Sequence, residues 1–441
     1  MDRRKTMTKD SVNESSWRGW AAALTLSLLS AVTAAATSQF SATLDYVAEQ
    51  VGTTGAGAAF VDAVKYFFSV GAVLAAPRFI KQYGKRAVFA AGCLVFLIPQ
   101  VWIPFNRAYG LFVVLKSMQG LCVVLFPLFL VMIADRCAPR DIGLATAILT
   151  GFTYAGGAAG GTIAGFCLSR MGWQASYHAI SAAMLLTILL AAPVFLNDGR
   201  TGGRHSEPAT GNTAAGSAVA GDAAAGDESA YRFVVRNRLT WFLIFAFFPT
   251  VWTVQSIWSD MIPFGLHLGF SDAQMGGVMS VSALSILAGS LLSGKVSDLA
   301  ASRGPNRLQR RAAVFALGTV LIMAGAAVLL SADLRPPKTG LFNFVVFFLS
   351  FGAAWGLGSF YSIFPEYFRD GEVSAANGFI GGLADMGMPA SPMFMAAAGI
   401  AGGHWRLAWS SCAFIAAVGL AFSAAILKCR AERTENARPA S

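Results

Sequence analysis

The sequence contains few of the residue patterns that mark enzymes, metal proteins and disulfide-bonded domains. Only 13% of its 441 residues are charged, and it has four histidines. Its six cysteines form no C-x-x-C pair, which argues against a zinc site or a redox pair. HExxH, EF-hand and G-x-S-x-G motifs are absent, and a near match to a phosphate-binding loop ends in Val296 instead of Ser or Thr. We therefore expect no enzymatic activity, no metal and no other cofactor.

Apolar residues, by contrast, make up 55% of the chain and fall in blocks of about 20 residues. Such a block is long enough to cross roughly 30 Å of hydrocarbon as a helix. A backbone in lipid must satisfy its hydrogen bonds internally, and the alternating pattern of a membrane barrel is absent. The sequence therefore predicts an all-α membrane protein in a lipid bilayer. The net charge of +10 lies between the blocks without interleaved aromatic residues, so nucleic acid is not an expected partner.

We place twelve membrane helices in two groups of six. Residues 197–238 between the groups are rich in Gly, Ala and Ser and predict a flexible linker. The expected domains are a bundle over 1–196, the linker, and a bundle with a short tail over 239–441. The first block resembles a signal peptide, but its apolar run continues, so we expect it to be retained. The helices are expected at about 19–42, 57–77, 87–106, 109–134, 142–168, 174–196, 239–267, 274–294, 311–331, 340–364, 374–400 and 406–428.

Basic residues predict the orientation of these helices, because cytoplasmic loops carry an excess of Lys and Arg. A basic turn over Pro77 to Arg86 lies on the expected cytoplasmic side, and the loops on the other side hold few basic residues. Both termini are thus expected in the cytoplasm, with the protein in the plasma or inner membrane. The basic residues of the opposite loops are Arg107, Arg170, Arg335, Lys338 and Arg406.

The two groups of helices also repeat one another. The turn over 77–86 corresponds to Gly294 to Arg303, and Gly172-Trp173 corresponds to His404-Trp405. Parallel repeats about an axis normal to the membrane place a substrate site near the midplane, between the halves.

Several short motifs resemble those of the major facilitator superfamily. The span near residue 116 carries Lys116, Gln119 and Gly120, similar to the family pattern R-x-x-Q-G, and the next span has Gly157, Gly161 and Gly165 on one face, where small residues allow close helix packing. The family's loop signature G-x3-D-x2-G-x-R aligns with two sets of residues, which are Pro77, Lys81, Gly84 and Arg86, and Gly294, Asp298, Ala301 and Arg303.

This resemblance implies two pseudo-symmetric six-helix bundles that alternate access to a central site, in a protein that is by family default a monomer. The two turns would act in gating. In the family the aspartate of the signature latches the halves together on the cytoplasmic side. We therefore expect a latch at Asp298 and none at Lys81, which has the opposite charge.

Ionisable residues inside the spans are the first candidates for a site, because each costs roughly 2.5–3.5 kcal/mol in the bilayer and usually lines a pathway or pairs. Lys65 and Lys116 could bind an anionic group or take part in proton coupling, although Asp62 could pair with Lys65 three residues later. Asp385 could be a protonatable carboxylate or the partner of a buried lysine. Asp260 lies near the outer end of its span and is expected to face water.

Polar and aromatic residues near the midplane could line a cavity, although for each aromatic residue a lipid or helix contact is the alternative. They are Tyr154, Trp252, Gln255 and Trp355.

These residues suggest two functions, both of them transport. The first is a secondary active transporter of a small organic anion, moved with protons, in which Lys116 binds the anion and Asp385 is the proton or pairing site. The alternative is a proton-driven exporter of apolar or cationic compounds, which would use the aromatic cavity and Asp385. A receptor or sensor on the same scaffold is a third class, but the linker contains no folded signalling domain.

Overall fold

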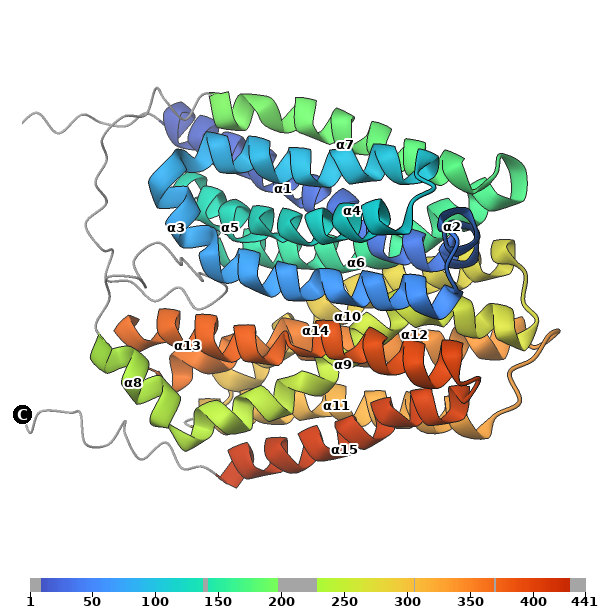
Figure 1. The fold of residues 1–441 in the computed structure, drawn as a ribbon. Coiled ribbons are helices and arrows are strands. Elements are labelled where there is room, and N and C mark those ends of the chain that lie inside the picture. Colours follow the sequence, from blue (N-terminus) through green and yellow to red (C-terminus); the bar gives the residue numbers. More distant parts are fainter. Residues whose placement is uncertain (1–8, 138–141, 197–227, 305, 369, 429–441) are drawn as a thin grey trace, which may run out of the picture.

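The computed structural model describes residues 9–137, 142–196, 228–304, 306–368 and 370–428, and every regular element in these ranges is a helix (Figure 1). The N-terminal half consists of α1 (Lys9–Ala42), α2 (Leu44–Val51), α3 (Gly55–Trp102), η1 (Ile103–Phe105), α4 (Tyr109–Leu121), η2 (Cys122–Val124), α5 (Leu125–Arg136), α6 (Ile142–Arg170) and α7 (Trp173–Leu196).

The C-terminal half repeats this order of long helices and adds a short one in front. It consists of α8 (Glu228–Arg236), α9 (Arg238–Leu268), α10 (Asp272–Ser302), α11 (Arg307–Ser331), α12 (Thr339–Phe360), η4 (Tyr361–Glu366), α13 (Asp370–Ala384), α14 (Gly387–Met395), η5 (Ala396–Ala401) and α15 (Trp405–Lys428).

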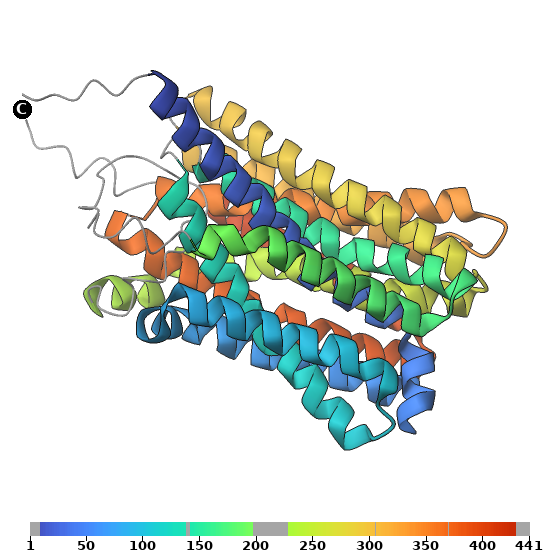
Figure 2. The ribbon, with the colours of Figure 1, turned by 90° about the horizontal axis from the view of Figure 1, so that it is seen from above.

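Ten helical segments of the described chain are long and apolar enough to cross a membrane. The glycine-rich α6 and the interrupted run of α13, α14 and η5 lie where the other two crossings were predicted. The fold class is therefore the predicted one, an all-α membrane protein with two six-helix halves. α1 begins and α15 ends at the same face of the molecule, which we call the terminal face (Figures 1 and 2). The opposite face, where α2 lies, is called the α2 face.

The first predicted turn is much shorter than the sequence indicated. Helix α3 contains both the second and the third span, and only Gly84 leaves the helical conformation, with φ of 80° and ψ of 159°. This left-handed value of φ is accessible to glycine without a Cβ clash, so the chain reverses within one residue. The prediction of a ten-residue turn over 77–86 was wrong in extent. In the second half, α10 likewise continues to Ser302, so Gly294 and Asp298 lie on a helix.

The predicted linker also contains more structure than its composition indicated. Residues 197–227 lie outside the described residues, but Glu228–Arg236 form α8. This helix packs through Tyr231 edge-on against Phe379 of α13 and buries Val234. The second half therefore begins at α8 rather than at residue 239.

Glycines on α6 allow three other helices to pack closely against it. A Cβ on Gly160 would lie 1.7 Å from the carbonyl oxygen of Ala35, so α1 and α6 touch backbone to backbone. On the adjacent face of α6, a Cβ on Gly157 would strike the indole ring of Trp258 in α9. Close approach through this second face was predicted from the glycine spacing, and its partners turn out to be α9 and α10 of the other half.

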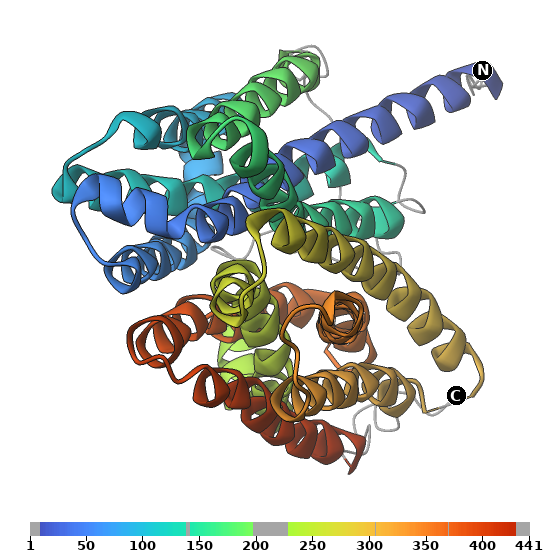
Figure 3. The ribbon, with the colours of Figure 1, turned by 90° about the vertical axis from the view of Figure 1, so that its right-hand side faces the viewer.

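The two halves are joined most firmly toward the α2 face. The hydroxyl of Ser41 donates to the carbonyl of Ser259, and Thr162 and Ser280 share a hydrogen bond of 2.8 Å. Viewed from the α2 face, the two halves form two adjacent groups of helices that meet along α1, α6, α9 and α10 (Figure 3). The hydrogen bonds that join Ser41 to Ser259, Thr162 to Ser280 and Gln255 to Tyr66 lie in the part of the membrane nearer this face. The arrangement is therefore closed at the α2 face.

Candidate functional site

A single buried carboxylate binds two buried lysines in the N-terminal half. Asp62 and Lys65 lie one turn apart on α3, and Lys65 Nζ is 2.7 Å from Asp62 Oδ1. Lys116 of α4 binds the same oxygen of Asp62. The exposed fractions are 3% for Asp62, 6% for Lys65 and 1% for Lys116. When all three groups are ionised, this cluster, which we call the lysine triad, has one excess positive charge.

Local packing holds the triad in place. Gly120 of α4 lies against the backbone of α3, where a Cβ would be 2.2 Å from the carbonyl oxygen of Lys65. Ser69 of α3 reinforces this contact by donating to the carbonyl of Gly120 over 3.0 Å. Because only a glycine allows this approach, α4 can bring Lys116 within reach of Asp62.

Two aromatic rings stabilise the ammonium groups of the triad by cation–π contacts. Lys116 Nζ lies 3.8 Å from the ring centroid of Phe40 in α1, and Lys65 Nζ lies 4.7 Å from that of Tyr66. A desolvated cation over an aromatic face is stabilised by about 2 kcal/mol. The rings therefore offset part of the cost of the excess charge but supply no negative charge of their own.

The triad is connected to the C-terminal half through Tyr66. Gln255 of α9 donates from Nε2 to the Tyr66 hydroxyl over 2.7 Å, and that hydroxyl donates to Thr37 of α1 over 3.4 Å. Gln255 was predicted as a lining residue, and the structure places it between the halves. Tyr66 was not predicted, although its position next to Lys65 is the sequence signal that could have identified it.

A chain of buried amides begins at Gln119, one helical turn from Lys116, and crosses the N-terminal bundle. Gln119 donates to Gln100, Gln100 donates to Gln39, and Gln39 donates to Ser176, over distances of 2.9, 2.7 and 3.1 Å. These residues come from α4, α3, α1 and α7, so the chain joins four helices by hydrogen bonds. Of its members, sequence reasoning identified only Gln119, as part of a motif.

Asp260 is the main correction in the C-terminal half. It was expected to face water near the outer end of its span, but only 1% of its surface is exposed. Helix α9 continues for eight residues beyond it, and residues of α1, α14 and α15 bind Ser259 and Ser256 on this part of α9. Its Oδ2 has no hydrogen-bond partner in the protein.

Polar atoms without partners are concentrated on this part of α9. Besides Asp260 Oδ2, they include Thr253 Oγ1, Gln255 Oε1 and Trp258 Nε1. Buried polar groups are nearly always paired, so these unpaired atoms make this part of α9 a candidate for contact with a ligand, a proton or water.

The three predicted aromatic residues have different surroundings. Tyr154 of α6 is half-buried, and its ring centroid lies 5.4 Å from that of Trp258, across the contact between the halves. Trp252 donates to Ser411 of α15 over 3.1 Å, and Trp355 donates to the carbonyl of Val314 in α11 over 2.8 Å. The structure thus brings Tyr154 to the contact between the halves, whereas the indole N–H groups of Trp252 and Trp355 bind helices of their own half.

Asp385 lies at the break between α13 and α14 and is half-buried. Its predicted alternative role, as the partner of a buried lysine, finds no support in the geometry. Lys65 and Lys116 both bind Asp62, and within the described ranges no ion pair reaches Asp385.

The turns at the terminal face are held by ion pairs within each half. Arg311 at the start of α11 binds Asp298 over 2.8 Å and Glu366 of η4 over 3.0 Å. In the first half, Lys85 binds Asp135 at the end of α5 over 2.5 Å. In this arrangement Asp298 therefore contacts its own half.

The remaining residues of the two turns have separate positions on α3 and α10. Arg86 donates to the carbonyl of Phe195 over 3.0 Å, Arg303 is the exposed residue that ends α10, and Gly294 lies two turns earlier on that helix. Lys81 is on α3, but its side chain is outside the described part of the structure.

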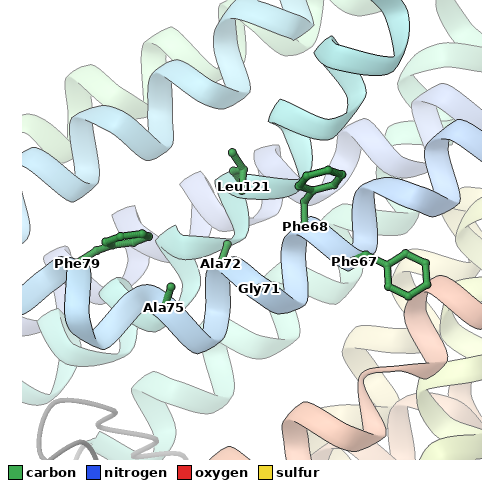
Figure 4. Close-up of a pocket in the computed structure, with 7 residues that line it drawn as sticks. All are labelled: Phe67, Phe68, Gly71, Ala72, Ala75, Phe79 and Leu121. Atoms are coloured by element: carbon green, nitrogen blue, oxygen red, sulfur yellow. The ribbon is translucent and has the colours of Figure 1, made fainter.

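An apolar hollow of about 330 Å³ lies on α3 beside the end of α4. Its lining consists of Phe67, Phe68, Gly71, Ala72, Ala75, Phe79 and Leu121 (Figure 4). No charged or polar side chain belongs to this lining, so it does not suit a charged solute. The polar centre formed by the triad and α9 is a separate feature.

These observations define a multi-pass membrane protein with two similar helical halves and a buried, charged centre near their contact. No group of metal-binding side chains occurs among the residues that the structure describes. A family model described as Major Facilitator Superfamily matches residues 26–336, which extend across both halves. The chain therefore belongs to the Major Facilitator Superfamily, and it is a secondary transporter rather than an enzyme. A comparison with curated proteins found no match.

Proposed function

We propose that this transporter moves a small organic anion together with protons. The observation that carries the proposal is the sharing of one carboxylate by two buried lysines next to the contact between the halves. With all three groups ionised, this triad has one excess positive charge. A buried uncompensated charge costs several kcal/mol, and a bound carboxylate would remove that cost. A cationic solute would increase it.

The anion would bind at Lys116 and Lys65, which Asp62 holds in place. Because Asp62 is shared by two ammonium groups, the anion can take over part of the coordination of one lysine while the other keeps Asp62 paired. Hydrogen bonds to charged groups contribute about 1.5–3 kcal/mol each, enough for a strong preference for anions. Gln255, with its free Oε1, and Tyr154 would contact the same solute from the side of the contact between the halves.

Transport would proceed by rocking of the two halves around this centre. We expect both termini in the cytoplasm, which assigns the terminal face to the cytoplasmic side and the α2 face to the outside. In this orientation the structure is closed to the outside. The turns at Lys81 to Arg86 and Gly294 to Arg303 would separate and rejoin at the cytoplasmic side. Asp298 would exchange its bond with Arg311 for a contact with the other half when that side closes. We expect the protein to act as a monomer.

Two carboxylates of the C-terminal half could accept the accompanying proton. Asp385 was predicted from the sequence and lies at the break in the eleventh crossing. Asp260, which was expected to face water, is buried on α9.

Uptake by purified protein in proteoliposomes tests the proposal. Labelled lactate, benzoate, oxalate and succinate would be compared with lipophilic cations under an imposed pH gradient. We expect saturable carboxylate uptake that an uncoupler abolishes. Lys116→Ala should raise KM about ten- to a hundredfold, because it removes one charge-assisted contact. Lys338→Ala, which removes an exposed lysine, is the matched control. Undiminished carboxylate uptake by the Lys116→Ala protein would contradict the assignment.

The second candidate is a proton-driven exporter of apolar or cationic compounds. The buried Asp260 and the adjoining rings of Tyr154 and Trp258 favour it, because a carboxylate among aromatic rings suits a lipophilic cation. Movement of cations against the proton gradient, with no carboxylate uptake, would establish this function instead.

A further inference from the structure

We propose that Asp260 of α9 carries the proton that accompanies the anion, and that the substrate is a monoanion moved with one proton and no net charge. This inference rests on the proposed function and names its coupling residue and its stoichiometry. It follows from the position of Asp260 and from the number of charged groups that the structure buries around it.

Asp260 has no directly bound partner among the described residues that would keep its carboxyl group ionised. It is buried, its Oδ2 has no partner, and no ion pair reaches it from any described residue. An isolated carboxylate in such a place would cost several kcal/mol, whereas the protonated acid avoids most of that cost. A proton taken up from the water at one face and released at the other is therefore the simplest way for this residue to change its charge.

Asp260 is also close enough to the triad to respond to its occupancy. The negative charge of Asp62 acts on Asp260 across the contact between the halves. The carbonyl of Ser259, the residue before Asp260, accepts a hydrogen bond from the hydroxyl of Ser41. Ser41 is the next residue after Phe40, whose ring contacts Lys116 Nζ. Helix α9 also carries Gln255, which binds Tyr66 beside Lys65. Two hydrogen bonds to α9 are therefore made by residues that directly follow Phe40 and Lys65, and they connect the surroundings of the triad with α9.

Few other titratable groups face Asp260. The thiol of Cys412 in α15 lies near it, next to Ser256, and Tyr154 of α6 contacts Trp258. The facing hydroxyls of Ser41 in α1 and Ser391 in α14 carry no charge. From α3, Asp62 is the charged neighbour, with the two lysines bound to it.

The charges of these groups balance in two ways. When Asp260 is ionised, the two carboxylates of Asp62 and Asp260 cancel the two lysines, and the empty centre is neutral. When a monoanion binds to the triad, protonation of Asp260 restores neutrality. Because each uncompensated buried charge is costly, binding of the anion and binding of the proton favour one another. Asp385 is half-buried and has no such contact with the triad, so the charge of the anion affects it less.

The experiment uses proteoliposomes and the monocarboxylate of the panel that the wild-type protein transports best. In wild type, accumulation should follow the pH gradient and be unchanged by a potential set with potassium and valinomycin. Asp260→Asn should keep exchange of labelled for unlabelled anion within about tenfold of wild type while losing at least tenfold of the pH-driven accumulation. Its KM should be independent of pH, whereas that of wild type should change by up to about tenfold per pH unit. Asp260→Glu should retain accumulation, and the exposed Asp333→Asn is the control.

Several results would overturn the inference. Accumulation that persists in Asp260→Asn, or that is lost only in Asp385→Asn, would place the proton elsewhere. Accumulation that follows the membrane potential would refute the one-to-one balance, as would transport of dicarboxylates only. Loss of exchange in a folded Asp260→Asn protein would show a role in binding or structure instead. A wild-type protein that moves no carboxylate at all would refute the proposed function itself.

Discussion

Replacing Asp62 by Asn gives the most direct test of the lysine triad. Both Lys65 and Lys116 contact the same carboxylate oxygen, so the substitution leaves two buried ammonium groups with no negative partner. Breaking a buried ion pair by removing one member costs about 3–5 kcal/mol. In domains of 150–250 residues each kcal/mol lowers the melting temperature by roughly 2–4 °C, so we expect a decrease of roughly 10 °C.

Thermal unfolding of the purified protein in detergent measures this decrease. A thiol-reactive dye is a suitable reporter, because Cys93, Cys122, Cys167 and Cys412 are buried and free and become reactive when the protein unfolds. The double variant Asp62→Asn/Lys116→Met has the same net charge in the centre as wild type and should recover part of the loss. Lys116→Met alone leaves Asp62 paired with Lys65 and should be milder. A melting temperature of Asp62→Asn equal to that of wild type, or a larger effect of Lys116→Met alone, would refute the shared-carboxylate reasoning.

Two further substitutions test the packing of the halves. Gly160→Val should abolish folding, because even a Cβ at this position would lie 1.7 Å from the carbonyl oxygen of Ala35; Gly71→Val, in open space, should leave the yield of monodisperse protein unchanged. Gln255→Leu removes a 2.7 Å hydrogen bond to Tyr66 between the halves and should make the closed α2 face less favourable by about 1–2 kcal/mol, or roughly tenfold in population. Spin labels on the two halves at the α2 face would detect longer distances, and an unchanged distance distribution would contradict the second prediction.

The helices of this protein follow closely from its sequence. The expected span at 109–134 corresponds to α4, η2 and α5 over 109–136, and the expected span at 239–267 corresponds to α9 over 238–268. Length and apolar content determine these positions, because a helix must match the thickness of the hydrocarbon. Turns were less predictable. At Gly84 a single residue reverses the chain, and polar composition alone could not show that its neighbours remain helical.

The candidate site was only partly predictable for a different reason. The pairing of Lys65 with Asp62 follows from a three-residue spacing on one helix. The contact of Lys116 with the same carboxylate joins residues that are far apart in the chain, and it depends on the close approach at Gly120. The burial of Asp260 was missed because distance from a helix end does not reveal which neighbours cover a side chain.

The sequence by itself determined that this chain crosses a membrane as two sets of six helices, and that lysines and carboxylates lie within them. Those properties depend on composition and on helical spacing, which act along one segment at a time. Only the tertiary structure decided that two lysines share Asp62, that Tyr66 meets Gln255, and that Asp260 is enclosed without a partner. These contacts depend on which helix faces pack together. The physical reason is that the electrostatic energy of a buried charge is set by its neighbours in space, and those neighbours come from different helices.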